Sequence, residues 1–284
     1  MLQFKEKRGK IMKKKIIRYS LGTLLFLLLL ISLLLIRSFL FWVAVFFIIV
    51  GLKEYRKMLA NIEIYPHKFL PEIASIIIAF ILCISTNPVM DQFFVMPTII
   101  IGILLSFIIT ILKNKKPYML TTFSTIGGIL LTYCGMYLIK LTHLKGNDEL
   151  ILVYILTVLL SDYIASIVGK KIKNKKPIAE EISPNKTVAG TVAHLLTSVI
   201  ASVLICTFGM KFNILFSLFF GTIISVFAQL GDLAVSTIKR ECNVEHSGTF
   251  FLNYGGFLDR MDAFIFSAPA IFYYLAFLSY IFKG

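Results

Sequence analysis

Charged residues are scarce in this sequence. Only 15% of its 284 residues are Asp, Glu, Lys or Arg, against roughly 25% in an average soluble domain. Hydrophobic residues make up 58% and the mean hydropathy is +0.86, which is more apolar surface than a water-soluble fold of this length could bury. Helices cross a bilayer because each one satisfies its own backbone hydrogen bonds. The composition therefore predicts an all-α integral membrane protein.

Cysteine is also scarce, and no separate soluble domain is visible. The four cysteines, at positions 83, 134, 206 and 242, have neither metal-ligand nor redox spacing. The first three sit in apolar runs, so we expect these to be packing residues. The chain contains no internal repeat and no low-complexity linker. Any polar site must then be built from helix ends and two polar stretches, Gly169 to Val188 and Lys239 to Asp262.

About nine apolar segments are long enough to be membrane helices, at roughly 20 residues per crossing, although the second is short. They run from Tyr19 to Ile36, Phe39 to Leu52, Phe69 to Ser85, Phe93 to Leu112, Tyr118 to Leu141, Leu150 to Val168, Ala189 to Met210, Phe212 to Leu230 and Ala263 to Phe282. The first has no small-residue cleavage site before Arg37, so we expect a retained helix. The chain divides into a basic segment (1–18), N-terminal membrane helices (19–148) and a C-terminal membrane region (149–284).

Basic residues indicate the orientation, because cytoplasmic loops carry the excess of Lys and Arg. Nine spans with the N-terminus inside place 24 of the 29 basic residues in the cytoplasm. We therefore expect a multi-pass protein of the inner cell membrane, with a cytoplasmic N-terminus and a polar site facing the cytoplasm. The net charge of +14 is explained by this orientation and by attraction to anionic membrane lipids, so no nucleic acid is required.

Two acidic residues follow long apolar runs, where a membrane should exclude them. Asp162 and Asp232 would each cost roughly 2.5 to 3.5 kcal/mol at a bilayer centre unless they face protein, water or a cation. Both are therefore candidates for a functional site. The alternative is that they simply reach water at cytoplasmic helix ends.

Asp232 heads a polar helix face. Helical spacing stacks it with Ser236 and with either Lys239 or Arg240, which places a carboxylate, a hydroxyl and a cation in one groove.

A second polar segment lies directly before the last apolar span. Gly255 and Gly256 allow backbone to approach a ligand closely, and Asp259 and Asp262 share a helical face beside Arg260. With the upstream acid, this segment favours Mg²⁺ plus phosphate, since Mg²⁺ takes one or two carboxylates, waters and phosphate oxygens. Zinc is disfavoured for lack of Cys and His ligands. A surface cluster of ion pairs is the alternative.

The stretch before the seventh span suits an anion. Ser183 or Asn185 could cap the helix, which would leave N–H groups, the Thr187 hydroxyl and Lys186 directed at a bound anion. An ordinary capped helix after a basic loop explains the same residues.

Taken in order, these motifs resemble the phosphatidate cytidylyltransferase (CDP-diacylglycerol synthase) family. The resemblance covers roughly Asp162 to Asp262 and rests on the following residues: Asp162, Ala165 and Gly169; Ser183-Pro184-Asn185-Lys186-Thr187 and Gly190; Gly231-Asp232, Ser236, Lys239 and Arg240; Gly255-Gly256, Leu258-Asp259-Arg260 and Asp262. It implies Mg²⁺-dependent transfer of a cytidylyl group from CTP to phosphatidic acid, with CDP-diacylglycerol and pyrophosphate as products, and it leaves open whether the chain forms a homodimer.

The resemblance also implies a role for each residue. The implied catalytic residues are Asp232, Asp259, Lys239 and Arg240; the metal ligands are Asp232, Asp259 and Asp262; and the substrate-binding residues are Asp162, Ser183, Lys186, Thr187, Ser236, Gly255, Gly256 and Arg260. In these roles the cations hold phosphates, the hydroxyls form hydrogen bonds to the phosphates, and the glycines let the backbone come close to the ligand.

The chain departs from the family pattern in three places. Glu245-His246 stands where a Lys-Asp pair is usual, Tyr254 where the family has His, and Val188-Ala189 where it has Trp-Glu. Three interpretations stay open: an active enzyme, a paralogue that binds lipid phosphate or nucleotide as a regulatory or partner subunit without turnover, and a small transporter with acids inside the membrane.

Overall fold

The computed structural model describes residues 40–84, 88–113, 117–142, 144, 148–172, 176–251 and 255–281. The basic N-terminal segment, the expected span from Tyr19 to Ile36 and the family-divergent Tyr254 lie outside these residues.

The described residues form helices apart from one short hairpin. The helices are α2 (Leu40–Ala60), α3 (Leu70–Ile84), α4 (Pro88–Leu112), α5 (Tyr118–Leu141), α6 (Asp148–Lys171), α7 (Val188–Ser202), which continues as the π-helix η2 (Val203–Gly209), α8 (Ile214–Glu241) and α9 (Leu258–Ile281); the strands are β1 (Pro177–Ala179) and β2 (Ser183–Thr187).

Each expected span from Phe39 onward falls on one of these helices. Helices α4 to α9, with α7 and η2 taken together, each contain a segment long and apolar enough to cross a membrane, and α3 is apolar but shorter. The protein is therefore an all-α, multi-pass membrane protein. Several helices are longer than their apolar part, and α8 ends at Glu241 instead of Leu230. Hydropathy marks where a helix meets lipid, whereas backbone hydrogen bonding carries the helix on into water.

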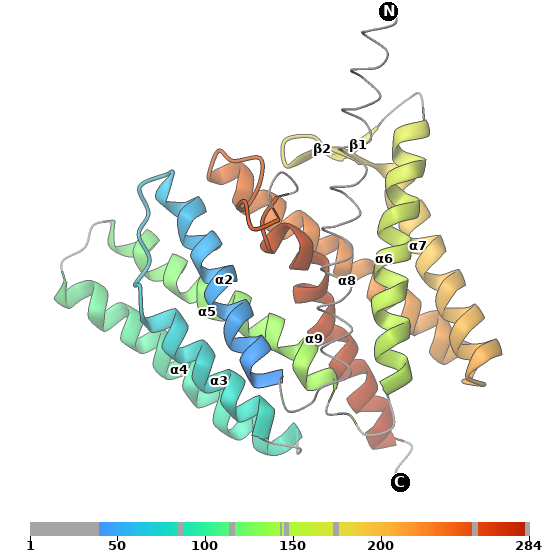
Figure 1. The fold of residues 1–284 in the computed structure, drawn as a ribbon, viewed down its shortest axis with the longest axis horizontal. Helices are drawn as coiled ribbons and strands as arrows, with labels where there is room; N and C mark the ends of the chain where they lie inside the picture. The colour runs from blue at the N-terminus through green and yellow to red at the C-terminus, as the bar shows by residue number, and fades with distance from the viewer. Residues whose placement is uncertain are drawn as a thin grey trace, which may run out of the picture.

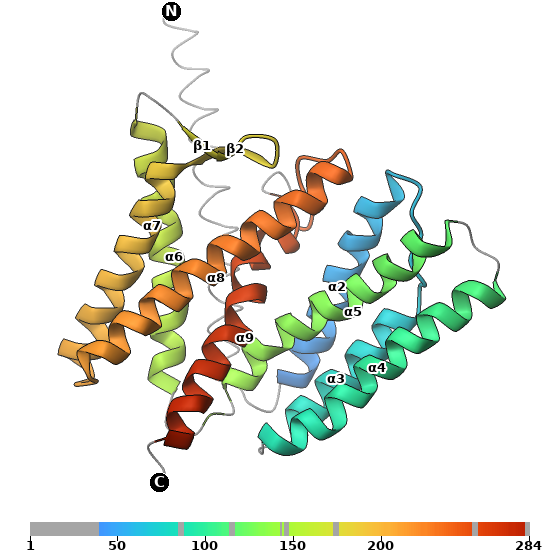
Figure 2. The same ribbon diagram turned by 180° about the vertical axis from the view of Figure 1, so that it is seen from behind.

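The helices form two groups joined by α9. Figures 1 and 2 show α2 to α5 on one side and α6 with α7 on the other, with α9 between them and α8 running obliquely across. Helix α9 packs against both α8 and α5. The buried Tyr154 hydroxyl lies 2.7 Å from Ser267 Oγ and so links α6 to α9.

One short hairpin lies between α6 and α7, within the stretch that the sequence analysis described only as polar. Strands β1 and β2 pair antiparallel, with Pro177 opposite Thr187 and Ala179 opposite Ser183. The segment Ser183–Thr187 lacks the alternation of apolar and polar residues that predicts a strand. Its pairing comes from the chain folding back on itself directly before α7.

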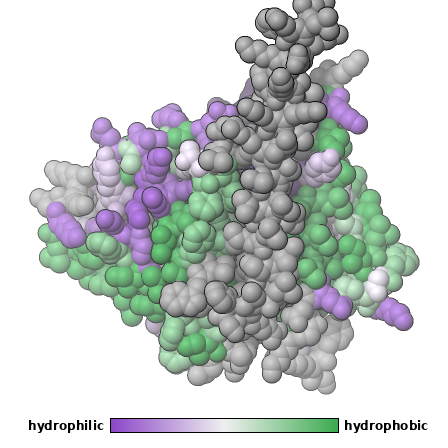
Figure 3. Space-filling view, viewed as in Figure 1, coloured by the Kyte–Doolittle hydropathy of each residue, from purple (hydrophilic) through white to green (hydrophobic). Residues whose placement is uncertain are grey.

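Polar and apolar side chains separate on the surface. Figure 3 shows hydrophilic residues gathered on the side of the molecule where α2 and α8 end, above a mostly hydrophobic surface. Phe93, Leu112 and Phe208 are 75%, 78% and 74% exposed, which suits contact with lipid. The polar loops therefore share one end of the helix bundle.

The three cysteines in apolar runs pack as expected. All four are free thiols, and Cys206 and Cys242 are buried. Burial raises the pKa of the Cys242 thiol, which directly follows α8, so this thiol ionises less readily than an exposed one.

Candidate active site

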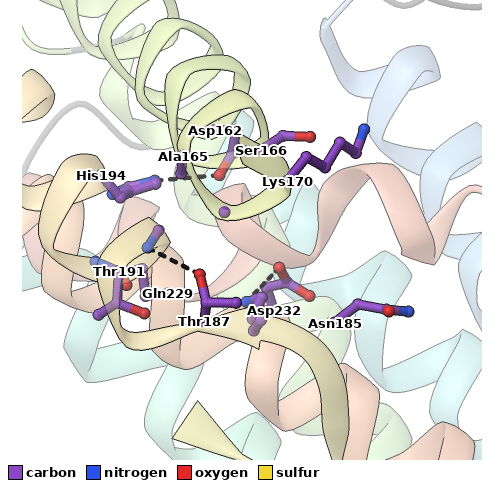
Figure 4. Close-up of a pocket in the computed structure, with 13 residues that line it drawn as sticks. Asp162, Ala165, Ser166, Lys170, Asn185, Thr187, Thr191, His194, Gln229 and Asp232 are labelled. Carbon is purple, nitrogen blue, oxygen red and sulfur yellow. Dashed lines mark hydrogen bonds and ion pairs between the residues drawn. The ribbon is translucent and has the colours of Figure 1, made fainter. Parts of the chain in front are cut away.

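A cavity of about 560 Å³ opens between α6, α7, α8 and the hairpin (Figure 4). It contains two lysines and two aspartates, together with hydroxyls, amides and one histidine. The lining residues are Asp162, Ala165, Ser166, Gly169, Lys170, Asn185, Lys186, Thr187, Gly190, Thr191, His194, Gln229 and Asp232. The two acids that the sequence analysis found after apolar runs therefore face a common polar space.

An ion pair spans this cavity. Lys186, from β2, pairs with Oδ2 of Asp232, from α8, and both side chains are about one-third exposed. The Ser236 hydroxyl donates to Asp232 Oδ1 at 3.4 Å, as the helical spacing predicts. The hairpin thus delivers a cation to the acid on α8, and water still reaches both.

The capping residue of α7 is Thr187, which corrects the expectation of Ser183 or Asn185. Thr187 has extended backbone angles, and its hydroxyl accepts a hydrogen bond at 3.1 Å from Gly190 N, three residues on. Ser183 and Asn185 belong to β2 instead, and Asn185 lines the cavity. One N–H group in the first turn of α7, that of Gly190, is therefore held by a residue that also lines the cavity.

Helices α8 and α9 cross at Gly231, next to Asp232. A Cβ atom at Gly231 would collide with the backbone carbonyl of Asp262, so only glycine allows this approach. Asp262 is 7% exposed, its Oδ1 accepts from Ala263 N at 2.8 Å, and the charges of Asp232 and Asp162 act on it. The crossing therefore gathers acids from two sequence-distant motifs.

A second ion pair lies further along α8. Lys239 Nζ is 2.6 Å from Asp259 Oδ1, and both side chains are nearly buried. Asp259 Oδ2 accepts from the backbone N–H groups of Ser247 and Gly256, each at 2.9 Å. Both oxygens of Asp259 are thus engaged.

The departures at Glu245 and His246 also belong to this end of α8. Both side chains are exposed, and His246 Nδ1 lies 3.7 Å from Asp259 Oδ2. Gly255 has a φ of +92°, and a side chain there would meet Asp259. The close approach of backbone that the sequence analysis predicted at Gly255 is therefore an approach to the carboxyl group of Asp259.

Three of the expected phosphate-binding cations, Lys239, Arg240 and Arg260, do not line the cavity. Arg240 is exposed, and its Nε donates to the carbonyl of Ile182 at 3.1 Å, which fastens the hairpin to the end of α8. Arg260 follows Asp259 on α9 and is half-buried. Lys170 lines the cavity instead, although the sequence analysis assigned it only to the basic loop.

Comparison with known proteins identifies the family. The cytidylyltransferase family model matches residues 16–278. The chain belongs to the cytidylyltransferase family. It is 32% identical over 171 residues to phosphatidate cytidylyltransferase of Bacillus subtilis (strain 168), covering 60% of this chain and 63% of that one. It is 34% identical over 173 residues to the enzyme of the same name from Staphylococcus saprophyticus, covering 60% and 64%.

A third relative carries no stated function. The chain is 28% identical over 145 residues to uncharacterized protein YnbB of Escherichia coli (strain K12), covering 51% of this chain and 48% of that one. In all three comparisons the match covers less than two thirds of the relative's length.

Glu54 supports the Asp259 cluster from outside the motif region. This buried side chain from α2 accepts from Phe257 N at 2.8 Å, Leu258 N at 3.0 Å and Ser247 Oγ at 3.0 Å. It thereby accepts hydrogen bonds from backbone N–H groups at the start of α9, and it fixes the loop that holds Asp259. The only signal in the sequence was a glutamate directly after an apolar span.

His194 is the second residue that sequence reasoning missed. It lines the cavity from α7 with a nearly buried side chain, and its Nε2 lies 3.1 Å from Asp162 Oδ1. A lone histidine in an apolar helix gives no sequence signal. Its partner lies 32 residues earlier, and only the packing of α6 on α7 joins them.

Proposed function

We propose that this protein transfers a cytidylyl group from CTP to phosphatidic acid, with CDP-diacylglycerol and pyrophosphate as products. The family and the names of its relatives support this reaction. The observation that carries the proposal is the crossing of α8 and α9, where Gly231, the neighbour of the cavity-lining Asp232, lies against the backbone carbonyl of Asp262. Lys170 and Lys186 in the same cavity suit phosphoryl groups.

Mg²⁺ fits the residues at this crossing. No group of three or more His, Cys, Asp or Glu side chains within the described ranges is arranged to hold a metal by protein ligands alone. Mg²⁺ needs no such cage, because waters and substrate phosphates complete its shell. Asp232 and Asp262 would hold it. Both oxygens of Asp232 have partners, but its side chain is about one-third exposed and can exchange Lys186 for the metal. Asp259 is nearly buried with both oxygens engaged, and it would hold Lys239 and the loop in place.

The reaction requires two anions to meet. An oxygen of the lipid phosphate attacks the α-phosphorus of CTP, the bond from that phosphorus to the β-phosphate bridging oxygen breaks, and pyrophosphate leaves with the electron pair. Lys186 and Lys170 would hold phosphates in the cavity, and Lys186 can exchange Asp232 for a phosphate oxygen because both side chains are partly exposed. Bound Mg²⁺ would neutralise charge on the phosphoryl oxygens in the transition state.

The same proposal places the site at the cytoplasmic face of the inner membrane, with the N-terminus in the cytoplasm. The separation of polar and apolar surface supports one polar end (Figure 3). CTP would enter from the cytoplasm and phosphatidic acid sideways from the leaflet. The exposed apolar helix faces would anchor the protein in lipid.

The test is direct. Purified protein in mixed micelles with CTP, Mg²⁺ and phosphatidic acid should form CDP-diacylglycerol, and EDTA should stop the reaction until excess Mg²⁺ is added. Asp232→Asn and Asp262→Asn should each abolish product without lowering the thermal unfolding midpoint appreciably. Glu149→Gln, an exposed acid at the opposite end of α6, is the matched control. Full activity of Asp232→Asn would disprove the proposed role of the crossing.

A regulatory paralogue is the second candidate, because Glu245 and His246 replace a Lys-Asp pair and are exposed. It predicts that the wild-type protein binds CTP without turnover, and that Glu245→Lys with Tyr254→His creates activity. Turnover by the wild-type protein excludes it.

A further inference from the structure

The inner end of the cavity presents a carboxyl group held in a fixed direction. Asp162 Oδ1 lies 3.1 Å from His194 Nε2 (Figure 4). The Asp162 side chain lines the cavity and is 52% exposed, whereas that of His194 is only 3% exposed. Because an ionised carboxylate only accepts hydrogen bonds, His194 Nε2 carries the hydrogen between them.

His194, on α7, is itself anchored by residues of the two helices α6 and α8. Its Nε2 also lies 3.1 Å from Ser161 Oγ on α6, and its Nδ1 lies 2.8 Å from Ser225 Oγ on α8. Gln229, which lines the cavity, donates to the same Ser225 Oγ at 2.9 Å. The partner of Asp162 Oδ1 is therefore a histidine that is itself held in place by buried, packed groups.

The cavity has two chemically different ends. Asp162 and Lys170 stand eight residues apart on α6, which is about 12 Å along a helix axis. Lys170 and Asn185 provide a cation and an amide at one end, while Asp162 and His194 provide a hydrogen-bond acceptor at the other (Figure 4). Lys186 also lines the cavity, where it pairs with Asp232. A ligand that suits both ends is anionic at one end and donates hydrogen bonds at the other.

A carboxylate at the inner end also excludes phosphate from it by charge repulsion. The polyphosphate of a nucleotide must then lie toward the lysines, which directs the base toward Asp162. This arrangement keeps the α-phosphate, between base and terminal phosphates, near Asp232.

We propose that Asp162, oriented by His194, accepts a hydrogen bond from the exocyclic amino group of the nucleobase and so selects cytosine over uracil. The inference rests on the proposed function for the identity of the nucleotide. Cytosine carries an amino group where uracil carries a carbonyl oxygen, and a carboxylate that accepts from that amino group repels the oxygen. Gln229 and Thr191, beside Asp162 in the cavity, have N–H and O–H groups for the acceptors of the cytosine ring.

Equilibrium binding of CTP and UTP to the full chain in detergent, with Mg²⁺ and without lipid, tests this inference. The wild-type protein should bind CTP at least about 100-fold more tightly than UTP, since a site built around a hydrogen bond rejects an analogue that cannot form it. Asp162→Asn should reduce this ratio to below about 10, because an amide can face the uracil oxygen with its N–H. Glu149→Gln should leave the ratio unchanged.

His194 is a positioning residue, so conservative replacement should rescue it. His194→Gln keeps a donor for Asp162 and should retain most of the discrimination, whereas His194→Leu should reduce the ratio toward that of Asp162→Asn. Thermal unfolding of each variant reports whether it folds. If Asp162→Asn does not fold, His194→Leu carries the test, because it leaves the carboxyl group in the cavity and removes only its orientation.

Equal affinity of the wild-type protein for CTP and UTP, or a ratio unchanged in every folded variant, overturns the inference. The proposed function is scored separately by product formation. Selective CTP binding that depends on Asp162 but yields no CDP-diacylglycerol would retain the inference and reject the activity. Equal product from CTP and UTP would do the reverse.

Discussion

Replacing Glu54 by glutamine should loosen the loop between α8 and α9 and slow the reaction, although Glu54 lies outside the cavity. Its two carboxyl oxygens accept from Phe257 N, Leu258 N and Ser247 Oγ at 2.8 to 3.0 Å. Because the two backbone donors use different oxygens, an amide nitrogen in place of either oxygen faces a donor.

The expected cost follows from that one mismatch. A buried N–H group left without an acceptor costs roughly 1–3 kcal/mol, and we take about 2 kcal/mol. At 1.4 kcal/mol per factor of ten, this is roughly a 30-fold increase in the fraction of molecules with the loop open. Since the same loop holds Asp259 against Lys239, the opened state should be inactive.

Hydrogen exchange measures this opening directly. The amides of Phe257 and Leu258 should exchange up to about 30-fold faster in Glu54→Gln than in the wild-type protein, while peptides from α3 and α4 keep their rates. Product formation should fall in parallel, and Glu149→Gln should alter neither quantity. Unchanged exchange at both amides would refute the argument that Glu54 holds this loop.

Two further substitutions test the packing that builds the site. Gly231→Ala should separate α8 from α9 at the Asp262 carbonyl and abolish product, whereas Gly209→Ala, with open space around it, should be neutral; equal activity of the two variants would contradict the crossing. Lys239→Met should lower stability by roughly 3–5 kcal/mol, because it leaves the nearly buried Asp259 without its cation. In the double variant Lys239→Met/Asp259→Asn, thermal unfolding should show that stability is partly restored, while activity stays absent. A double variant no more stable than Lys239→Met alone would argue against the ion pair between Lys239 and Asp259.

The sequence alone determined the class of protein and the approximate positions of the helices. Apolar runs report membrane helices because a bilayer admits few other structures, so the expected segments from Phe39 onward coincide with α2 to α9. Helical spacing also predicted correctly that Ser236 lies on the face of Asp232. Local regularity sufficed for these features, since each depends on residues within a few turns of one another.

Only the tertiary structure decided which polar groups meet. Asp259 and Asp262 are three residues apart, yet one pairs with Lys239 while the other lies at the crossing beside Asp232. The contact of Asp162 with His194 likewise joins separate helices. Such contacts depend on how helices cross, and crossing is set by close-packed surfaces such as Gly231 against α9, which no periodicity within a single segment encodes.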